Sequence, residues 1–192
     1  MSPRPYEMGR RRDAVDETRA RIVAATRDLL VAKGTVAVDA IARQADVSRA
    51  TVYYQFGTKI GLLEALCDDL AERGHMERLA EAFGQPDARA ALRTFVEVIA
   101  DFWAVDRDCT RRLRGLAALD PDVGQVIAAR DDRRRSGAAV LATRLGAGPN
   151  FSPVLHTLTG FEVFDSLAAD RPIPDAAPTI LALLRAALAS MT

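Results

Sequence analysis

The sequence predicts an all-α protein, with an N-terminal three-helix unit followed by a larger C-terminal helical domain. Apolar residues recur at helical spacing along most of residues 16–190. None of these segments shows the period-2 alternation of a half-buried strand. Glycine and proline fall between the periodic segments, where they end one helix and let the next turn back. With 192 residues, 49% of them hydrophobic, the chain can bury a sizeable core.

Three helices are expected near the N-terminus. The first spans residues 16–33 and ends at Gly34, and its apolar face carries Ile22, Val23, Leu29 and Leu30. A short helix over 38–44 follows, then a turn at 45–47. Ser48 caps a third helix that reaches about Gln55. The last two pieces are too short to be stable alone, so they must pack on one another and on the first helix.

The short pair of helices has the pattern of a helix-turn-helix. The apolar residues Ile41, Ala42, Val47 and Val52 would point inward, and the turn needs a residue that tolerates positive φ, which Asp46 can supply. The third helix then exposes residues that can contact base edges and phosphates: Arg49, Ala50, Thr51, Tyr53 and Tyr54. Arg49 is the best candidate to read a base, the alternatives being a solvated arginine or a phosphate contact. Tyr53 is alternatively a core aromatic between the short helices.

Charge along the chain supports the same interpretation. Lys and Arg number 26 and so do Asp and Glu, but residues 1–60 hold eleven basic against seven acidic residues. Basic surfaces attract the phosphates of nucleic acids. We therefore expect residues 1–15 to form a flexible basic arm and 16–60 a DNA-binding domain. The remaining residues, 61–192, are expected to form the domain for effector binding and dimerisation, for the reasons given below.

Residues 17–66 resemble the TetR family of transcription regulators. The family pattern is matched by Thr35, Ile41-Ala42, Val47-Ser48, Tyr53, Phe56, Lys59 and Leu62-Leu63. The chain departs from it at Asp46, where the family usually has glycine, and at Ile60, where an acidic residue commonly follows the lysine. The resemblance implies that the major groove is entered by Ser48, Arg49, Ala50, Thr51 and Tyr53, and that phosphates are contacted by Thr35, Tyr54 and Lys59. It also implies a homodimeric repressor that binds palindromic operator DNA and is released by a small molecule.

Six further helices are expected beyond the helix-turn-helix. They span residues 58–83, 88–105, 110–119, 123–145, 153–169 and 175–190. The charged run from Arg130 to Arg135 in the fourth of them is expected to be a solvated face. An effector pocket for a small apolar or aromatic molecule is predicted from one set of residues: Phe95, Ile99, Phe102, Trp103, Leu113, Leu116, His156 and Phe161. The alternative is that these aromatic residues are ordinary core.

The last two helices are apolar around most of their circumference. A helix that is apolar on two faces needs two partners, and the second is most simply the same helix pair of another subunit in a four-helix bundle. The residues expected at that dimer interface are Phe164, Leu181, Leu184 and Leu188. The resemblance implies the same mode of dimerisation.

The chain carries no recognisable catalytic, metal or cofactor motif. Cys67 and Cys109 lack the spacing of a dithiol or metal pair, so buried inert thiols are expected. The N-terminus has no hydrophobic leader, and no apolar run was expected to approach the ~20 residues of a membrane span, which favours a cytoplasmic protein without membrane partners. Two other interpretations remain: an enzyme or small-molecule carrier on a helical scaffold, and a DNA-binding protein without an effector.

Overall fold

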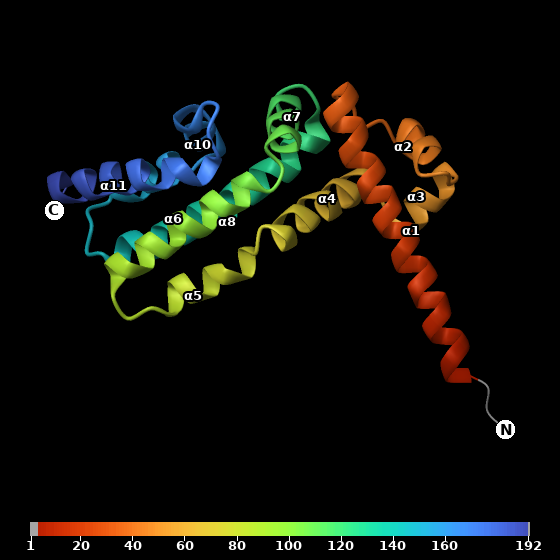
Figure 1. The fold of residues 1–192 in the computed structure, drawn as a ribbon, viewed down its shortest axis with the longest axis horizontal. Coiled ribbons are helices and arrows are strands. Elements are labelled where there is room, and N and C mark those ends of the chain that lie inside the picture. Colours follow the sequence, from red (N-terminus) through yellow and green to blue (C-terminus); the bar gives the residue numbers. More distant parts are fainter. Residues whose placement is uncertain (1–3, 192) are drawn as a thin grey trace.

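The computed structural model describes residues 4–191, and throughout that range the regular elements are helices (Figure 1). The predicted all-α fold class is therefore confirmed. The molecule is elongated. α1, α2 and α3 lie at one end, and the C-terminal helix α11 lies at the other, with α4 running between the two parts. The long α6 and α8 form the middle of the C-terminal domain.

The N-terminal unit consists of α1 (Arg4–Lys33), α2 (Val38–Gln44) and α3 (Arg49–Phe56). The bounds of α2 agree with the sequence prediction, but α1 starts well before residue 16. Residues 4–15 continue the helix, which corrects the expectation of a flexible arm there, while residues 1–3 lie outside the described residues. Pro5 falls in the first turn, where the missing N–H has no helical partner to lose. Arginine, glutamate and methionine, frequent in this segment, favour helix.

One hydrophobic cluster holds α1, α2 and α3 together. Ile22 of α1, Ile41 of α2 and Val52 of α3 are each at most 1% exposed within it. Leu62 and Ala65 from α4 (Lys59–Arg73) complete the same cluster. The N-terminal unit thus depends on the first half of α4 for its core.

The helix predicted over 58–83 is broken in three. α4 ends at Arg73, a short 3₁₀ turn η1 spans Met76–Arg78, and α5 spans Leu79–Gly84. His75 adopts φ 52°, in the left-handed region that ends a helix. A Cβ on Gly74 would lie 2.9 Å from the Cα of Phe102, so α6 crosses where only glycine fits. The break is therefore caused by the passage of α6, which local periodicity does not reveal.

The C-terminal domain is completed by α6 (Ala88–Ala104), α7 (Arg107–Ala117), α8 (Pro121–Arg144), α9 (Phe151–Leu158), α10 (Phe161–Ala168), η2 (Ile173–Ala176) and α11 (Ala177–Met191). The helix predicted over 153–169 is two helices, because Gly160 is extended (φ −72°, ψ 152°). The break leaves the carbonyl of Thr159 free to accept a hydrogen bond from the Trp103 indole N–H at 3.1 Å. The tryptophan of α6 is thereby fixed by the α9–α10 junction.

The four residues predicted at a dimer interface belong to the core of the chain itself. Phe164 and Leu184 are 0% exposed, and Leu181 and Leu188 are 8% exposed, all within one cluster formed largely by α6, α8, α9, α10 and α11. Side chains with no accessible surface cannot also form the surface that a second subunit contacts. The expectation is therefore wrong for Phe164 and Leu184, because an apolar helix face does not show whether its partner is intramolecular. Leu181 and Leu188 keep a little accessible surface, and their place at an interface stays a prediction.

Within residues 4–191, one segment has the length and composition of a membrane span. It is Ile173–Met191, with a mean hydropathy of 1.2. The expectation that no run would approach this length is corrected. The segment contains Asp175 and Arg185, and it packs against α6 and α9, as the core helix of a folded domain does. The apolar residues on the buried side of this segment belong to the core of the C-terminal domain described above.

Candidate DNA-binding surface and ligand cavity

The turn between α2 and α3 has the geometry that the sequence predicted. Asp46 takes φ 51°, and the next amide, that of Val47, donates to the carbonyl of Ala42 at 3.0 Å. The prediction that Asp46 occupies the positive-φ position is confirmed. A short aspartate is among the few side chains other than glycine that tolerate this conformation. The turn directs α3 away from α2 with its first residues exposed.

Ser48 is the N-cap of α3, as predicted. Its Oγ accepts a hydrogen bond from the amide of Thr51 at 2.9 Å and lies 2.8 Å from the Thr51 hydroxyl. The cap satisfies one of the amides that the first turn of a helix leaves without a partner. The two hydroxyls predicted to enter the major groove are therefore adjacent and hydrogen-bonded to each other at the start of α3.

Arg49 is held between α2 and its own helix. Its Nη1 donates to the carboxylate of Asp39 at 3.1 Å, and its Nη2 donates to the Tyr53 hydroxyl at 3.3 Å. The guanidinium also lies 5.5 Å from the centroid of the Tyr53 ring. The Arg49 side chain is 57% exposed. It is oriented by two partners while remaining accessible.

The other predicted DNA-contacting residues differ in exposure. Tyr54 is 84% exposed, whereas Tyr53 is half-buried and packs against the N-terminal cluster, as its alternative role of a core aromatic predicts. The contact of Tyr53 with DNA stays a prediction. Ala50 is exposed beside Arg49. Thr35, half-buried before α2, accepts a hydrogen bond from the amide of Ala37 at 3.3 Å.

Lys59, predicted to contact phosphate, is bound to the C-terminal domain. Its Nζ lies 2.5 Å from a carboxylate oxygen of Asp120 and 3.3 Å from one of Asp122. Partial burial would lower the pKa of Lys59, but the hydrogen bonds to both aspartates outweigh it and raise that pKa. The hydrogen bond from Lys59 lowers the pKa of Asp120. Asp120 is also the N-cap of α8, accepting from the amides of Asp122 and Val123.

A second ion pair of the same kind joins α1 to α7. Arg27 donates from Nε to Asp106 at 2.5 Å, and the Asp106 side chain is only 5% exposed. Asp106 caps α7 through the amide of Cys109. Both aspartates therefore serve two purposes, capping a helix of the C-terminal domain and binding a cation of the N-terminal unit. Neither contact was predicted, because each joins residues at least 61 positions apart.

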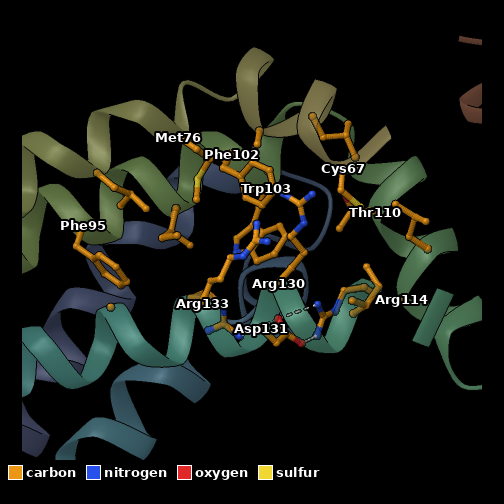
Figure 2. Close-up of a pocket in the computed structure, with 18 of the residues that line it drawn as sticks. Cys67, Met76, Phe95, Phe102, Trp103, Thr110, Arg114, Arg130, Asp131 and Arg133 are labelled. Carbon is orange, nitrogen blue, oxygen red and sulfur yellow. Dashed lines mark hydrogen bonds and ion pairs between the residues drawn. The ribbon is translucent and has the colours of Figure 1, made fainter. Parts of the chain in front are cut away.

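A cavity of about 320 Å³ lies between α4, α5, α6, α7 and α8. This volume is within the range of roughly 300–1,000 Å³ typical of small-molecule sites. Figure 2 shows Trp103 in the middle of the lining, with the labelled α8 side chains Arg130, Asp131 and Arg133 on one side of it. The apolar lining comes from several helices: Leu70, Ala71, Met76, Leu79, Phe83, Phe95, Ile99, Phe102, Trp103, Leu113 and Ile127.

The structure brings five of the eight residues predicted for the pocket to this cavity: Phe95, Ile99, Phe102, Trp103 and Leu113. The other three lie elsewhere. Leu116 borders a shallow surface depression with Val31 and Leu119. Phe161 packs edge-on against Trp103, with ring centroids 5.5 Å apart, from outside the lining. His156 contributes its backbone carbonyl, which accepts a hydrogen bond from Arg134.

The polar lining of the cavity is mostly arginine. The expectation that residues 130–135 form a solvated face holds for Asp132, Arg133 and Arg135, which are exposed, and fails for the half-buried Arg130, Asp131 and Arg134. Arg114 of α7 and Arg130, Arg133 and Arg134 of α8 line it together with Asp131. A signal was present in the sequence, since Arg130 and Arg134 continue the stripe of Val123, Ile127, Ala138 and Leu141 at helical spacing. Their charge concealed a position that periodicity would have placed inward.

Neither cysteine is poised to react. Both are buried, and burial raises the pKa of Cys67 to about 11 and that of Cys109 to about 12. The thiolate, which is the reactive form, is therefore scarce at neutral pH. In the part of the chain that the structure describes, no group of three or more His, Cys, Asp or Glu residues is placed to hold a metal ion.

Comparison with known proteins identifies the N-terminal unit. Residues 22–66 match the family model of bacterial regulatory proteins of the tetR family. Comparison with curated proteins gives no match. Among solved structures, the chain is similar to a TetR-like transcriptional regulator from Rhodococcus sp. RHA1, with 25% identity, a TM-score of 0.64, and coverage of 90% of this chain and 96% of that one.

Two further structures share the fold at lower identity. One is native NalD of Pseudomonas aeruginosa, the secondary repressor of the MexAB-OprM multidrug efflux pump, at 20% identity and a TM-score of 0.65, covering 91% of this chain and 97% of that one. The other is a TetR transcription regulator from Haloarcula marismortui, at 19% identity and a TM-score of 0.64, covering 92% and 98%. The chain thus has the architecture of helix-turn-helix transcription regulators. Specifically, residues 22–66 match the tetR family model, and the chain as a whole shares the fold of solved TetR-type regulators.

We expect the Lys59–Asp120 ion pair to make a pH-dependent contribution to the free energy of unfolding. Asp120→Asn removes the carboxylate charge but keeps an oxygen that can cap α8. Because the pKa of Asp120 is lowered in the folded state, the pair stabilises the fold above the unfolded pKa of about 4, and this contribution is lost as the pH falls through the folded pKa. We expect the variant to lose about 1 kcal/mol in free energy of unfolding at pH 7. Urea denaturation should show the difference shrinking towards pH 3.

The matched control is Asp122→Asn, whose carboxylate is farther from Lys59 and 43% exposed, and which should cost less. A deficit of Asp120→Asn that is the same at pH 7 and pH 3 would show that the cap, and not the ion pair, was disturbed.

Proposed function

We propose that this protein is a cytoplasmic transcription repressor that binds palindromic operator DNA as a homodimer and is released by a small molecule bound in the C-terminal cavity. The observation that carries the proposal is the exposed start of α3. It belongs to a helix-turn-helix matched by the tetR family model, with its turn and N-cap formed as such a unit requires. The same arrangement in a dimer would present two such helices to successive major grooves.

The α3 surface supports base recognition by Arg49. A guanidinium can donate two hydrogen bonds to the O6 and N7 atoms of guanine, and its contacts to Asp39 and Tyr53 restrict the directions it can take. Pre-orientation reduces the entropy lost on binding. Ala50 beside it has room to approach a thymine methyl group. Ser48 and Thr51 supply hydroxyls on the first turn of the helix.

Phosphate contacts would flank this surface. Tyr54 is the most exposed of the large hydrophobic side chains in residues 13–191 and can donate its hydroxyl to a phosphate oxygen. Thr35 stands before α2, and Lys59 at the first turn of α4. Since Lys59 is paired with Asp120, it would reach a phosphate by exchanging one anion for another. We propose that Lys59 therefore contributes less to affinity than an unpaired lysine would.

Dimerisation would use the outward face of α11. Thr179, Ala182, Leu183 and Ala186 are exposed there, and Arg185 is the helix's one charged residue. Leu183 is 45% exposed whereas the adjacent Leu184 is fully buried, because successive residues of a helix lie on different faces. An apolar surface of small side chains lets two helices approach closely, and a two-fold axis would pair α11 with its copy. The proposed interface thus uses exposed residues of α11 in place of the buried residues expected from sequence, which were Phe164 on α10 and three leucines on α11.

Release by a ligand would act through α4. Cys67, Leu70 and Ala71 of α4 line the cavity, while Leu62 and Ala65 of the same helix are part of the N-terminal core. A ligand that displaces the second half of α4 would carry the helix-turn-helix with it. Such a ligand shifts operator affinity only if it prefers the DNA-incompetent arrangement.

A first experiment tests base recognition. An operator is selected from random duplex DNA with the wild-type protein, and binding is then measured for that operator and for guanine substitutions within each half-site. Arg49→Ala should weaken binding to the selected operator by about tenfold to a hundredfold, the equivalent of about 1 to 3 kcal/mol, and lose discrimination at one guanine. Arg93→Ala, which removes an exposed arginine of α6, is the control and should bind as the wild type does.

If Arg49→Ala weakened every sequence equally and lowered only the salt dependence, Arg49 would be a phosphate contact and its role as a base reader would be wrong.

A second experiment tests the dimer. Analytical ultracentrifugation of the wild type at micromolar concentration should show a dimer, and Leu183→Glu should shift it to monomer because a charge would be buried without a partner. Val140→Glu changes a side chain of similar exposure (50%) on α8 and should remain dimeric. If Leu183→Glu remained a dimer with the dimerisation affinity of the wild type, the dimer interface would have to lie on another surface.

A further inference from the structure

Four arginines form one wall of an otherwise apolar cavity. Arg114 comes from α7, and Arg130, Arg133 and Arg134 come from consecutive turns of α8. Figure 2 shows Arg114, Arg130 and Arg133 around Asp131, on the α7–α8 side of Trp103. Placing an arginine in the lining of an apolar pocket costs free energy, because its charged guanidinium loses water, unless an anion pairs with it. The carboxylates that meet these arginines therefore decide what the cavity can accept.

Three carboxylates neutralise part of this wall. Arg114 is paired with Asp131 at 3.0 Å and with Glu162, and Arg134 shares the same Asp131 at 3.3 Å. Arg130 is paired with Asp68 at 2.6 Å. Among residues 13–191, whose side chains the structure describes, Arg133 makes no ion pair. Four guanidinium groups against three carboxylates leave one guanidinium at this wall, that of the exposed Arg133, without an anionic partner among those residues.

Arg134 supplies a second, independent observation, because it and His156 each hold a buried side-chain nitrogen without a hydrogen-bond partner in the described part of the chain, the Arg134 Nε and the His156 Nε2. The Arg134 side chain is 8% exposed, and its Nε has no hydrogen-bond partner among the described residues although it is buried. Its other nitrogens donate to Asp131, to the carbonyl of His156 and to the hydroxyl of Thr159. Burial lowers the pKa of Arg134, chiefly by desolvation of the charged form. A buried N–H left without an acceptor is rare in folded proteins and costs free energy.

The rest of the lining suits an apolar body. Phe83 and Phe95 stand edge to face, with ring centroids 6.2 Å apart. A Cβ on Gly137 would lie 3.2 Å from the Phe83 ring, so α8 comes close to these rings one turn beyond the arginines. Trp103 has its indole N–H committed to Thr159, so it offers a ring surface and no donor. The cavity thus has aromatic walls and an arginine wall.

We propose that the cavity binds a small amphipathic carboxylic acid, with its carboxylate at Arg133 and Arg134 and its acyl or aryl body against Phe95, Phe102 and Trp103. This inference rests on the proposed function, because it assigns a chemical class to the effector of the same cavity. The proposal narrows the predicted effector from any small apolar or aromatic molecule to one that also carries a negative charge. A single acid group compensates the one unpaired charge, and an apolar body displaces water from the aromatic wall.

The test compares acids with uncharged analogues of equal length. The four probes are decanoate, decan-1-ol, 4-phenylbutanoate and 4-phenylbutan-1-ol, each titrated into the full chain by calorimetry at pH 7.5. Quenching of Trp103, the chain's one tryptophan, reports whether binding occurs in the cavity. At least one acid should bind at least about tenfold more tightly than its alcohol, which is the gain expected from a charge-assisted hydrogen bond. Comparison of the decyl pair with the phenylbutyl pair shows whether a linear or an aromatic apolar group fits the cavity better.

Two variants of α8 place the acid group. Arg133→Gln removes an exposed charge that makes no ion pair, so the fold should be retained, and it should abolish the preference for acid over alcohol. Arg135→Gln is the matched control two residues along the chain, outside the lining, where Arg135 pairs with Asp132. Its affinities should equal those of the wild type. Circular dichroism and the thermal midpoint verify that both variants are folded.

The outcomes separate this inference from the proposed function. Equal affinity for acid and alcohol, an unchanged preference in Arg133→Gln, or no binding by any probe at 1 mM would overturn the carboxylic acid assignment, whatever the protein does with DNA. A neutral probe that binds alone and releases operator would overturn the assignment while supporting the effector function. An acid that binds through Arg133 without changing operator affinity would support the assignment and contradict release by ligand.

Discussion

Helix α4 buries two faces in two different hydrophobic clusters, and the arrangement of the protein depends on this constraint. Leu62 and Ala65 pack with the helices of the N-terminal unit. Leu63, Leu66 and Leu70, on the other side, pack with residues of α1, α7 and α8. A rigid helix that belongs to both clusters cannot move in one without moving in the other. The position of α3 relative to the C-terminal domain is therefore set by how α4 sits against α7 and α8.

Electrostatic contacts reinforce the same connection. Asp106 and Asp120 each cap a helix of the C-terminal domain and bind a cation of the N-terminal unit, Arg27 or Lys59. Removing either cation would leave a carboxylate still held by backbone amides. The two parts of the chain are thus joined by one continuous apolar cluster and by the ion pairs of Arg27 with Asp106 and of Lys59 with Asp120 and Asp122. A ligand beside Leu70 and Ala71 would act on this junction and not on an isolated pocket.

Much of the N-terminal unit could be predicted from sequence because its determinants are local. The turn residue Asp46, the cap Ser48 and the bounds of α2 follow from neighbouring residues. The errors arose where distant parts of the chain decide. Gly74 breaks a helix because α6 crosses there, and Leu184 is buried by its own domain although its periodicity fitted a dimer interface equally well.

The ligand cavity was predicted in part for the same reason. Phe95, Ile99 and Trp103 share an apolar stripe of α6, so periodicity found them. Arg134 was missed because a charged run is usually solvated, and only the packing of α8 against α9 shows that this arginine faces inward. The sequence prediction for Arg134 rested on its charge, whereas its position on α8 determines that the side chain faces inward.

The central claim is that the cavity and the DNA-binding surface are coupled through α4. The most direct test is the dissociation constant of the tightest-binding probe, measured by calorimetry for the free protein and for the protein saturated with its selected operator. Linkage requires that operator DNA lower the affinity of the protein for the probe by the same factor by which the probe lowers its affinity for operator DNA. The account predicts a reduction of about tenfold or more, equal in both directions. A probe that binds both forms with the same affinity would contradict the coupling.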